Sequence, residues 1–225
     1  MISSTPRILI IVPAYNAARY LPELIARITV FVPHEDVLFV DDGSTDDTAD
    51  IVARSTCRTI IFPDNRGKGA ALKAGFDFAI QRDYDAVVTM DADLQHPPEY
   101  LPRFLDHCVQ ADLVVGTRSI RAGGMPLSRM ISNTLSSLVI SILGKAKVRD
   151  SQSGYRLIPV AVLKRLHLAS DGFETESELL FQAGRLGLTV VEVPIPTIYG
   201  RSASFIRPVR DTGRFLWETW RRMWY

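Results

Sequence analysis

Short runs of apolar, mostly β-branched residues alternate along this chain with longer segments whose apolar residues recur at helical spacing. The expected strands are residues 8–12, 37–40, 59–62, 86–90 and 113–116, and the expected helices are residues 20–31, 45–54, 68–81 and 98–109. Strands that alternate with helices form parallel sheets with right-handed crossovers. The pattern therefore predicts one α/β domain with a Rossmann-like, doubly wound and mostly parallel sheet.

Composition narrows the classes of protein that this chain can belong to. Its 225 residues, 47% hydrophobic, suffice for a large buried core, and the net charge of +1 gives no reason to expect nucleic-acid binding. The two cysteines lie far apart, as in a protein of a reducing compartment. The first apolar run is too short for a signal peptide, and residues 135–143 are too few to span a bilayer. We expect a cytoplasmic protein without a transmembrane helix.

Polar residues follow the expected strands directly. They are Tyr15 and Asn16, next to Pro13, after the first strand, Asp41 and Asp42 after the second, Asp91, Asp93 and Gln95 after the fourth, and Arg118 after the fifth. Ligands of doubly wound sheets bind beyond the carboxyl ends of the strands. The sequence therefore predicts a site on one rim, with four carboxylates and one guanidinium.

The pair Asp91 and Asp93 is a candidate metal site. Two carboxylates separated by one residue can face the same pocket when the chain turns, and hard oxygen ligands suit Mg²⁺ or Mn²⁺. Gln95 could add a neutral oxygen, and a metal held there could bridge the two phosphates of a diphosphate ligand. The alternative is a solvated turn without a metal.

Two further features of the rim allow more than one interpretation. Asp42 or Ser44 could cap the next helix, which would leave Asp41 or Asp42 to bind a base or a ribose. Residues 65–69 resemble a phosphate-binding loop without the full Walker spacing. Lys68 could contact a phosphate, or it could simply begin a helix.

Six motifs together carry a resemblance to a known family: PAYNAARYLP, VDDGSTDDT, NRGKGAALKAG, MDADLQHPPE, GTR and DSQSGYR. In this order the chain resembles the family 2 glycosyltransferases of GT-A fold, and among them dolichol-phosphate mannose synthases and bacterial polyprenyl-phosphate glycosyltransferases. The resemblance implies a catalytic domain over residues 1–206. It also implies nucleotide binding by Pro13, Tyr15, Asp41 and Asp42, and metal and diphosphate binding by Asp91, Asp93 and Gln95. We expect Asn16, Lys68 and Ala92 to line the same donor site, while Ala17 stands where relatives often carry Glu.

The acceptor side is expected to be cationic. A phosphate monoester is already an oxyanion at neutral pH, so it needs cations rather than a general base. The resemblance implies that Arg118, Arg129 and Asn133 hold a lipid phosphate, and Arg156 is a further candidate; relatives commonly carry Ser at position 133. The alternative for each arginine is solvation or pairing with Asp150.

The resemblance also implies an inverting displacement, in which Arg201, on a loop that covers the diphosphate, stabilises the leaving group. The donor expected is GDP-mannose or a UDP-hexose, and the acceptor a polyprenyl or dolichyl phosphate. Glu176 could instead serve as the base for a hydroxyl acceptor, or it could order the acceptor loop. More distant alternatives are a sugar-phosphate nucleotidyltransferase and a non-catalytic nucleotide-sugar sensor.

Two amphipathic segments suggest contact with a membrane surface. Residues 126–147 carry apolar side chains at helical spacing, which is consistent with a core helix or, following the resemblance, with an interfacial helix. Residues 207–225 form an expected helix rich in Arg and Trp, a composition that suits the headgroup boundary. We therefore expect peripheral binding to the cytoplasmic face of a membrane.

Overall fold

The computed structural model describes residues 6–108, 111–118, 127–196 and 198, and it describes residues 127–132 by their helical backbone alone. The strands are β1 (Ile8–Ala14), β2 (Val37–Asp41), β3 (Arg58–Ile61), β4 (Ala86–Thr89), β5 (Leu113–Arg118), β6 (Arg156–Pro159) and β7 (Val190–Ile195). The α-helices are α1 (Leu21–Ile28), α2 (Thr48–Arg54), α3 (Lys68–Gln81), α4 (Leu101–Leu105), α5 (Leu127–Leu143), α6 (Val160–Leu163) and α7 (Glu174–Arg185). Short 3₁₀ turns, η1 (His34–Asp36) and η2 (Pro98–Tyr100), precede β2 and α4.

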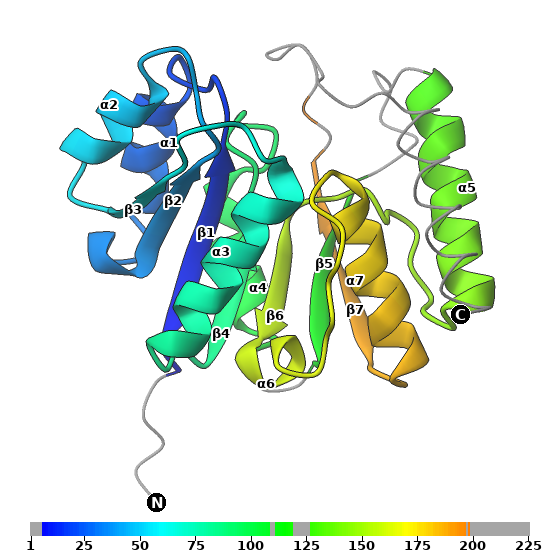
Figure 1. Ribbon diagram of the computed structural model, residues 1–225. Helices are drawn as coiled ribbons and strands as arrows, with labels where there is room; N and C mark the ends of the chain where they lie inside the picture. The colour runs from blue at the N-terminus through cyan, green and yellow to red at the C-terminus, as the bar shows by residue number, and fades with distance from the viewer. Residues whose placement is uncertain (1–5, 109–110, 119–126, 197, 199–225) are drawn as a thin grey trace, which may run out of the picture.

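The described strands form one sheet in the order β3-β2-β1-β4-β6-β5-β7 (Figure 1). All neighbours are parallel except β6, which runs antiparallel to both β4 and β5. The expectation of a mostly parallel, doubly wound α/β sheet is confirmed. The antiparallel strand β6 was not expected, because it is four residues long and Leu157 and Ile158 are too short an apolar run to indicate a strand.

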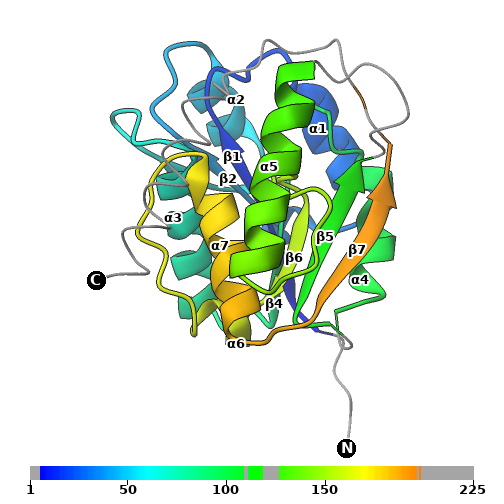
Figure 2. The same ribbon diagram turned by 90° about the vertical axis from the view of Figure 1, so that its right-hand side faces the viewer.

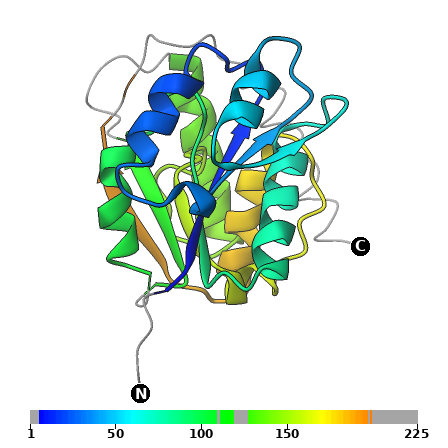
Figure 3. The ribbon, with the colours of Figure 1, turned by 90° about the vertical axis from the view of Figure 1, so that its left-hand side faces the viewer.

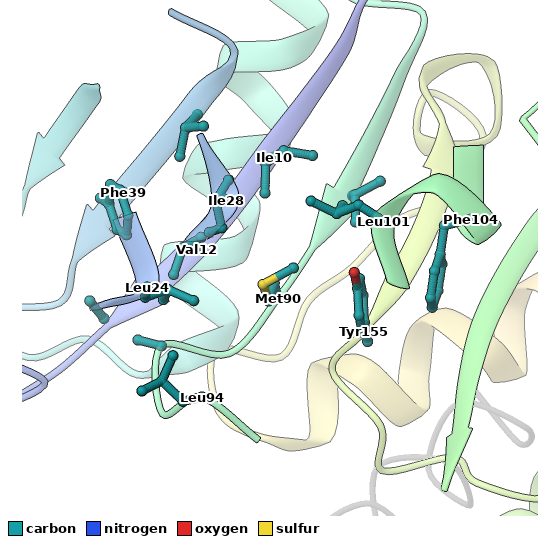
Figure 4. Close-up of a cluster of buried hydrophobic side chains, with 14 of the residues drawn as sticks. Ile10, Val12, Leu24, Ile28, Phe39, Met90, Leu94, Leu101, Phe104 and Tyr155 are labelled. Atoms are coloured by element: carbon teal, nitrogen blue, oxygen red, sulfur yellow. The ribbon is translucent and has the colours of Figure 1, made fainter. Parts of the chain in front are cut away.

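Alternation of side chains along the central strands divides the core into two layers. Ile10 and Val12 of β1 face one cluster of buried residues, whereas Leu9 and Ile11 face the other. Helices α1, α2 and α4 cover the first face, and α3, α5, α6 and α7 cover the second (Figures 2 and 3). Figure 4 shows the first cluster, where side chains from α1 and α4 pack against β1, β2 and β4. Both faces of the sheet are thus buried, which leaves the strand ends to form a site.

The helix boundaries follow the local chemistry of the chain. Helix α3 spans the expected residues, but α2 begins at Thr48, three residues later than expected. The preceding residues are engaged elsewhere, because Ser44 contacts Asp41 and the Thr45 amide donates to Asn16. The helix expected over 98–109 is shorter in the structure and consists of η2 followed by α4.

Helix α5 packs beside α7 (Figure 2) and exposes several large apolar side chains. Ile140 is buried, whereas Leu135, Leu138, Ile142 and Leu143 are exposed. Within the described part of the chain, no helix combines the length and hydropathy required to cross a bilayer. The expected helix over residues 207–225, together with Arg201, lies outside the described residues.

Candidate active site

The rim of the sheet gathers the polar residues that follow β1, β2 and β4. β1 lies between β2 and β4 and is parallel to both, so the three strands end at the same edge. Ala14 is paired with Asp41 in the register of β1 and β2. Asp91 comes two residues after the end of β4. The loops that carry Asn16, Asp42 and Asp91 therefore meet on one rim, as the sequence predicted.

The antiparallel strand β6 adds a loop to this rim that strand-end reasoning missed. Arg156, the first residue of β6, is paired with Thr89 near the end of β4 and with Val115 of β5. Because β6 runs the opposite way, the residues that precede it lie where β4 and β5 finish. The loop 150–155 thus reaches the site from the start of a strand.

Asp41 and Asp42 organise the rim around β2, and neither of them caps α2. The carboxylate of Asp41 accepts hydrogen bonds from the hydroxyl and the amide of Ser44. Asp42 accepts the amide protons of Arg66 and Gly67 at 2.7 and 2.9 Å. Burial raises the pKa of Asp42, although these two amides oppose the shift. Asp42 therefore holds the loop that leads to Lys68.

The loop after β1 is joined to the loop after β2 by side chains. Asn16 has a left-handed backbone with φ 48°, and its side-chain oxygen accepts the Thr45 amide proton at 2.8 Å. Its own amide donates to the Ser44 hydroxyl at 2.9 Å, and the Ala17 amide donates to Thr48 at 2.8 Å. These bonds hold the loops that border Pro13 and Tyr15 in a fixed relation before any ligand binds.

Asp91 and Asp93 lie on a tight turn that buried side chains support. Leu94 adopts a left-handed backbone with φ 61°, and the Gln95 amide donates to Asp93 Oδ1 at 3.0 Å. His96 is buried, and its Nδ1 accepts the Asp91 amide proton at 3.1 Å. Burial lowers the pKa of His96, which is consistent with a neutral ring that accepts at Nδ1. His96 thus positions Asp91, a role that sequence reasoning did not assign.

Lys68 joins Asp91 to Glu176 across the rim. Its ammonium lies 2.6 Å from Asp91 Oδ1 and 3.1 Å from Glu176 Oε1. Burial would lower the pKa of Lys68, but the two carboxylates outweigh it and raise that pKa. Burial likewise opposes ionisation of Asp91, yet the Lys68 ammonium holds the pKa of Asp91 below its usual range. Gly154 lies against both carboxylates, because a Cβ added there would meet Asp91 and Glu176 oxygens at 2.7 to 2.9 Å.

Arg118 and Asn133 converge on the buried carboxylate of Asp150. Arg118 Nε and Nη2 donate to the two Asp150 oxygens at 2.7 and 2.9 Å, and Asn133 donates to Asp150 at 3.0 Å. Burial alone would raise the pKa of Asp150, but the Arg118 guanidinium holds it below its usual value. The structure therefore brings together Arg118 and Asn133, two of the expected acceptor residues, and it shows the pairing of Arg118 with Asp150 that was the alternative.

The side chain of Arg156 does not lie where the sequence suggested, on the surface that would contact the acceptor. Its side chain is 1% exposed, and its guanidinium donates to the backbone carbonyls of Ser151, Ser153 and Glu176. The guanidinium is thus used to hold the loop before β6 against the start of α7. In this arrangement Arg156 positions the site and does not reach its surface. The side chain of Arg129 lies outside the described part of the structure.

The oxygen donors at the rim fit a divalent metal ion that is completed by its substrate. In the described ranges, no three His, Cys, Asp or Glu side chains form a group that could hold a metal alone. Asp91, Asp93 and Gln95 offer two carboxylates and an amide oxygen on one turn. Mg²⁺ and similar ions are usually bound through one or two carboxylates plus substrate phosphates and water. The donor set therefore suits a metal bound together with a diphosphate.

Fold and site together define an α/β domain with acidic side chains gathered at the carboxyl ends of its strands, where ligands of such sheets bind. Residues 9–166 match the model of the family described as glycosyl transferase family 2. An undecaprenyl-phosphate mannosyltransferase of Micrococcus luteus is 36% identical over 200 residues, which cover 84% of this chain and 82% of the relative. A polyprenol monophosphomannose synthase of Mycolicibacterium smegmatis is 35% identical over 204 residues, covering 85% of this chain and 77% of the relative.

The fold also has a solved counterpart. A glucosyl-3-phosphoglycerate synthase from Mycobacterium tuberculosis, crystallised with Mn²⁺ and UDP, superposes with a TM-score of 0.75 at 22% identity. The match covers 94% of this chain and 77% of that one. The chain belongs to glycosyl transferase family 2, and it is a glycosyltransferase of GT-A fold.

Proposed function

We propose that this enzyme transfers a sugar from a nucleotide diphosphate sugar to a polyprenyl phosphate at a membrane surface. The observation that carries the proposal is that α5 bears both an exposed apolar stripe and Asn133, which meets Arg118 at Asp150. Two relatives that are at least 35% identical bear names that specify lipid phosphates and mannose. These names favour GDP-mannose over a UDP-hexose as the donor.

The donor would lie over the loops that follow β1, β2 and β4. Pro13, Tyr15 and Asn16 would face the nucleoside, on loops that the buried carboxylates of Asp41 and Asp42 hold in place. Asp91, Asp93 and Gln95 would hold Mg²⁺ or Mn²⁺, which neutralises charge on the departing diphosphate. Arg201, outside the described residues, is proposed to add a second cation to that group.

The acceptor phosphate would attack the anomeric carbon directly. A phosphate oxygen forms the new bond while the bond from that carbon to the diphosphate breaks, so the configuration inverts. No proton has to leave the acceptor, because a phosphate monoester is ionised at neutral pH. Arg118 and Asn133 are held side by side on the carboxylate of Asp150. Arg118, Asn133 and, from the adjacent turn of α5, Arg129 would orient the phosphate.

The exposed stripe of α5 supports the placement of this reaction at a membrane. Leu135, Leu138, Ile142 and Leu143 are between 39% and 64% exposed. They lie on the helix that also carries Asn133, so an apolar surface and the acceptor site share one element. An interfacial helix of this kind would deliver a lipid-borne phosphate to the rim without crossing the bilayer.

A transferase that uses a hydroxyl acceptor is the second candidate, and the position of Glu176 is the observation that favours it. Its carboxylate lies beside Asp91, where a general base could face an acceptor. Lys68 already binds that carboxylate at 3.1 Å, however, and Glu176 is only 6% exposed. The geometry therefore supports an ordering role for Glu176 better than proton transfer.

Transfer from a panel of GDP and UDP sugars to polyprenyl phosphate in liposomes, with Mn²⁺ or Mg²⁺, tests the proposal. We expect a glycolipid that no longer forms after chelation of the metal. The variant Glu176→Gln is expected to keep transfer to the lipid phosphate. Release of nucleoside diphosphate without a glycolipid, combined with loss of turnover in Glu176→Gln, would assign the hydroxyl acceptor instead.

A further inference from the structure

Lys68 links the turn that carries Asp91 to the start of α7. It is the first residue of α3, and its ammonium contacts Asp91, a proposed metal ligand, and Glu176 at the start of α7. The side chain is only 14% exposed. A buried ammonium with two carboxylate partners carries its charge at neutral pH, so the site holds a fixed cation before any metal or donor binds.

The backbone of α3 keeps this ammonium near the rim. The Ala70 amide donates to the carbonyl of Asp171 at 3.1 Å. A Cβ added at Gly69 would lie 1.9 Å from the Thr175 hydroxyl oxygen, so the start of α3 is packed directly on the loop before α7. Lys68 can therefore change partners only by moving its own side chain.

The ammonium has opposite effects on the two groups that the site is proposed to bind. Next to Asp91, it repels a divalent cation that uses the same carboxylate. A diphosphate arriving at Asp91 and Asp93 offers Lys68 a new anionic partner within reach. The same charge thus weakens binding of a metal alone and strengthens binding of a metal together with a diphosphate.

We propose that Lys68 couples metal binding to donor binding, so that the carboxylates of Asp91 and Asp93 bind the metal well only together with the diphosphate. This inference rests on the proposed donor site and adds a specific role for one residue in it. The ammonium acts on each ligand directly, because it repels the metal and attracts the diphosphate, so its removal is expected to change the affinity for both. A residue that only supported the local fold would weaken both, whereas Lys68 predicts changes of opposite sign.

Calorimetric titration of the full chain with Mn²⁺ alone, and with GDP or UDP at saturating Mn²⁺, tests the proposal without an acceptor. In Lys68→Met the Kd for Mn²⁺ alone is expected to fall about tenfold, as for loss of a unit charge a few Å from a divalent ion in water. The Kd for the nucleotide at saturating Mn²⁺ is expected to rise about tenfold. Lys68→Arg keeps the charge and should retain the coupling of the wild type.

The matched control is Lys73→Met, which removes another ammonium of α3, one that pairs with Asp171. It is expected to change neither Kd. Weaker binding of both ligands to Lys68→Met, or no change in either, would overturn the proposal while leaving the metal site in place. Absence of Mn²⁺ binding to the wild type, even with nucleotide, would remove the metal site together with this role of Lys68. Neither result depends on which acceptor the enzyme uses.

Discussion

The substitution Gly154→Ala tests whether the close packing of the site is required for turnover. The new Cβ would lie 2.7 and 2.9 Å from the two oxygens of Asp91 and 2.9 Å from Glu176 Oε1. Ordinary contact begins at 3.4 Å, so the nearest oxygen must retreat by about 0.7 Å, the difference between 3.4 and 2.7 Å. Lys68 holds both carboxylates, so they cannot move away from it freely.

A shift of this size displaces a proposed metal ligand relative to the reacting groups. Misplacement by 1 Å can cost about 100-fold in rate, so we expect kcat/KM for the donor to fall at least about tenfold. Overpacking of the loop is expected to lower the free energy of unfolding by about 1 to 3 kcal/mol. Steady-state transfer kinetics and urea unfolding of the same preparation measure the two effects separately.

Gly187→Ala is the matched control for this prediction. Gly187 has a φ of 70°, and a Cβ added there would meet nothing within 4 Å. A left-handed alanine costs about 1 to 2 kcal/mol in stability, and no site residue has to move. We expect Gly187→Ala to lose stability and retain kcat/KM. Unchanged kinetics in Gly154→Ala, or an equal loss in Gly187→Ala, would refute the reasoning.

Three further predictions concern stability and membrane binding. Arg156→Met should lower the free energy of unfolding by about 3 kcal/mol in urea titrations, since the carbonyls it binds lose a charged donor. The Arg118 guanidinium lowers the pKa of Asp150 in the folded protein, so the ionised carboxylate stabilises the fold fully above about pH 4. That contribution is lost as the pH falls through the pKa of Asp150 in the folded state. The free energy of unfolding of Asp150→Asn should therefore depend less on pH below about 4 than that of the wild type. The same pH dependence in both proteins would contradict this. Ile142→Glu should weaken co-sedimentation with lipid vesicles about tenfold, whereas Val30→Glu, at a still more exposed apolar residue away from α5, should not.

Much of the donor side could be predicted from local patterns. The expected segments over β1, β2 and β4 match the structure closely, because each strand is a continuous apolar run buried on both faces. Asp41 and Asp91 follow those strands in the sequence, and parallel pairing brings their ends to one rim. Helix α5 could likewise be predicted from its periodicity, and the exposed residues Leu138 and Ile142 belong to that pattern.

The acceptor side depended on features that local patterns do not contain. β6 offers only Leu157 and Ile158 as apolar signal, so neither its existence nor its antiparallel direction could be predicted. Without that direction, nothing indicates that a loop before a strand joins the rim. Arg156 looked like a surface cation in the sequence, and the structure uses it to hold that loop.

The sequence by itself determined the strands β1 to β5 with the helices between them, the residues at the ends of these strands and the membership of a family. The tertiary structure decided the partners of the charges. Lys68 meets Glu176 although 108 residues separate them, and Arg118 meets Asp150 across 32 residues. Apolar periodicity reports which face of an element is buried, whereas the partner of a charged side chain depends on how the elements pack. Which charged side chains pair with each other in the site is therefore decided by the tertiary structure.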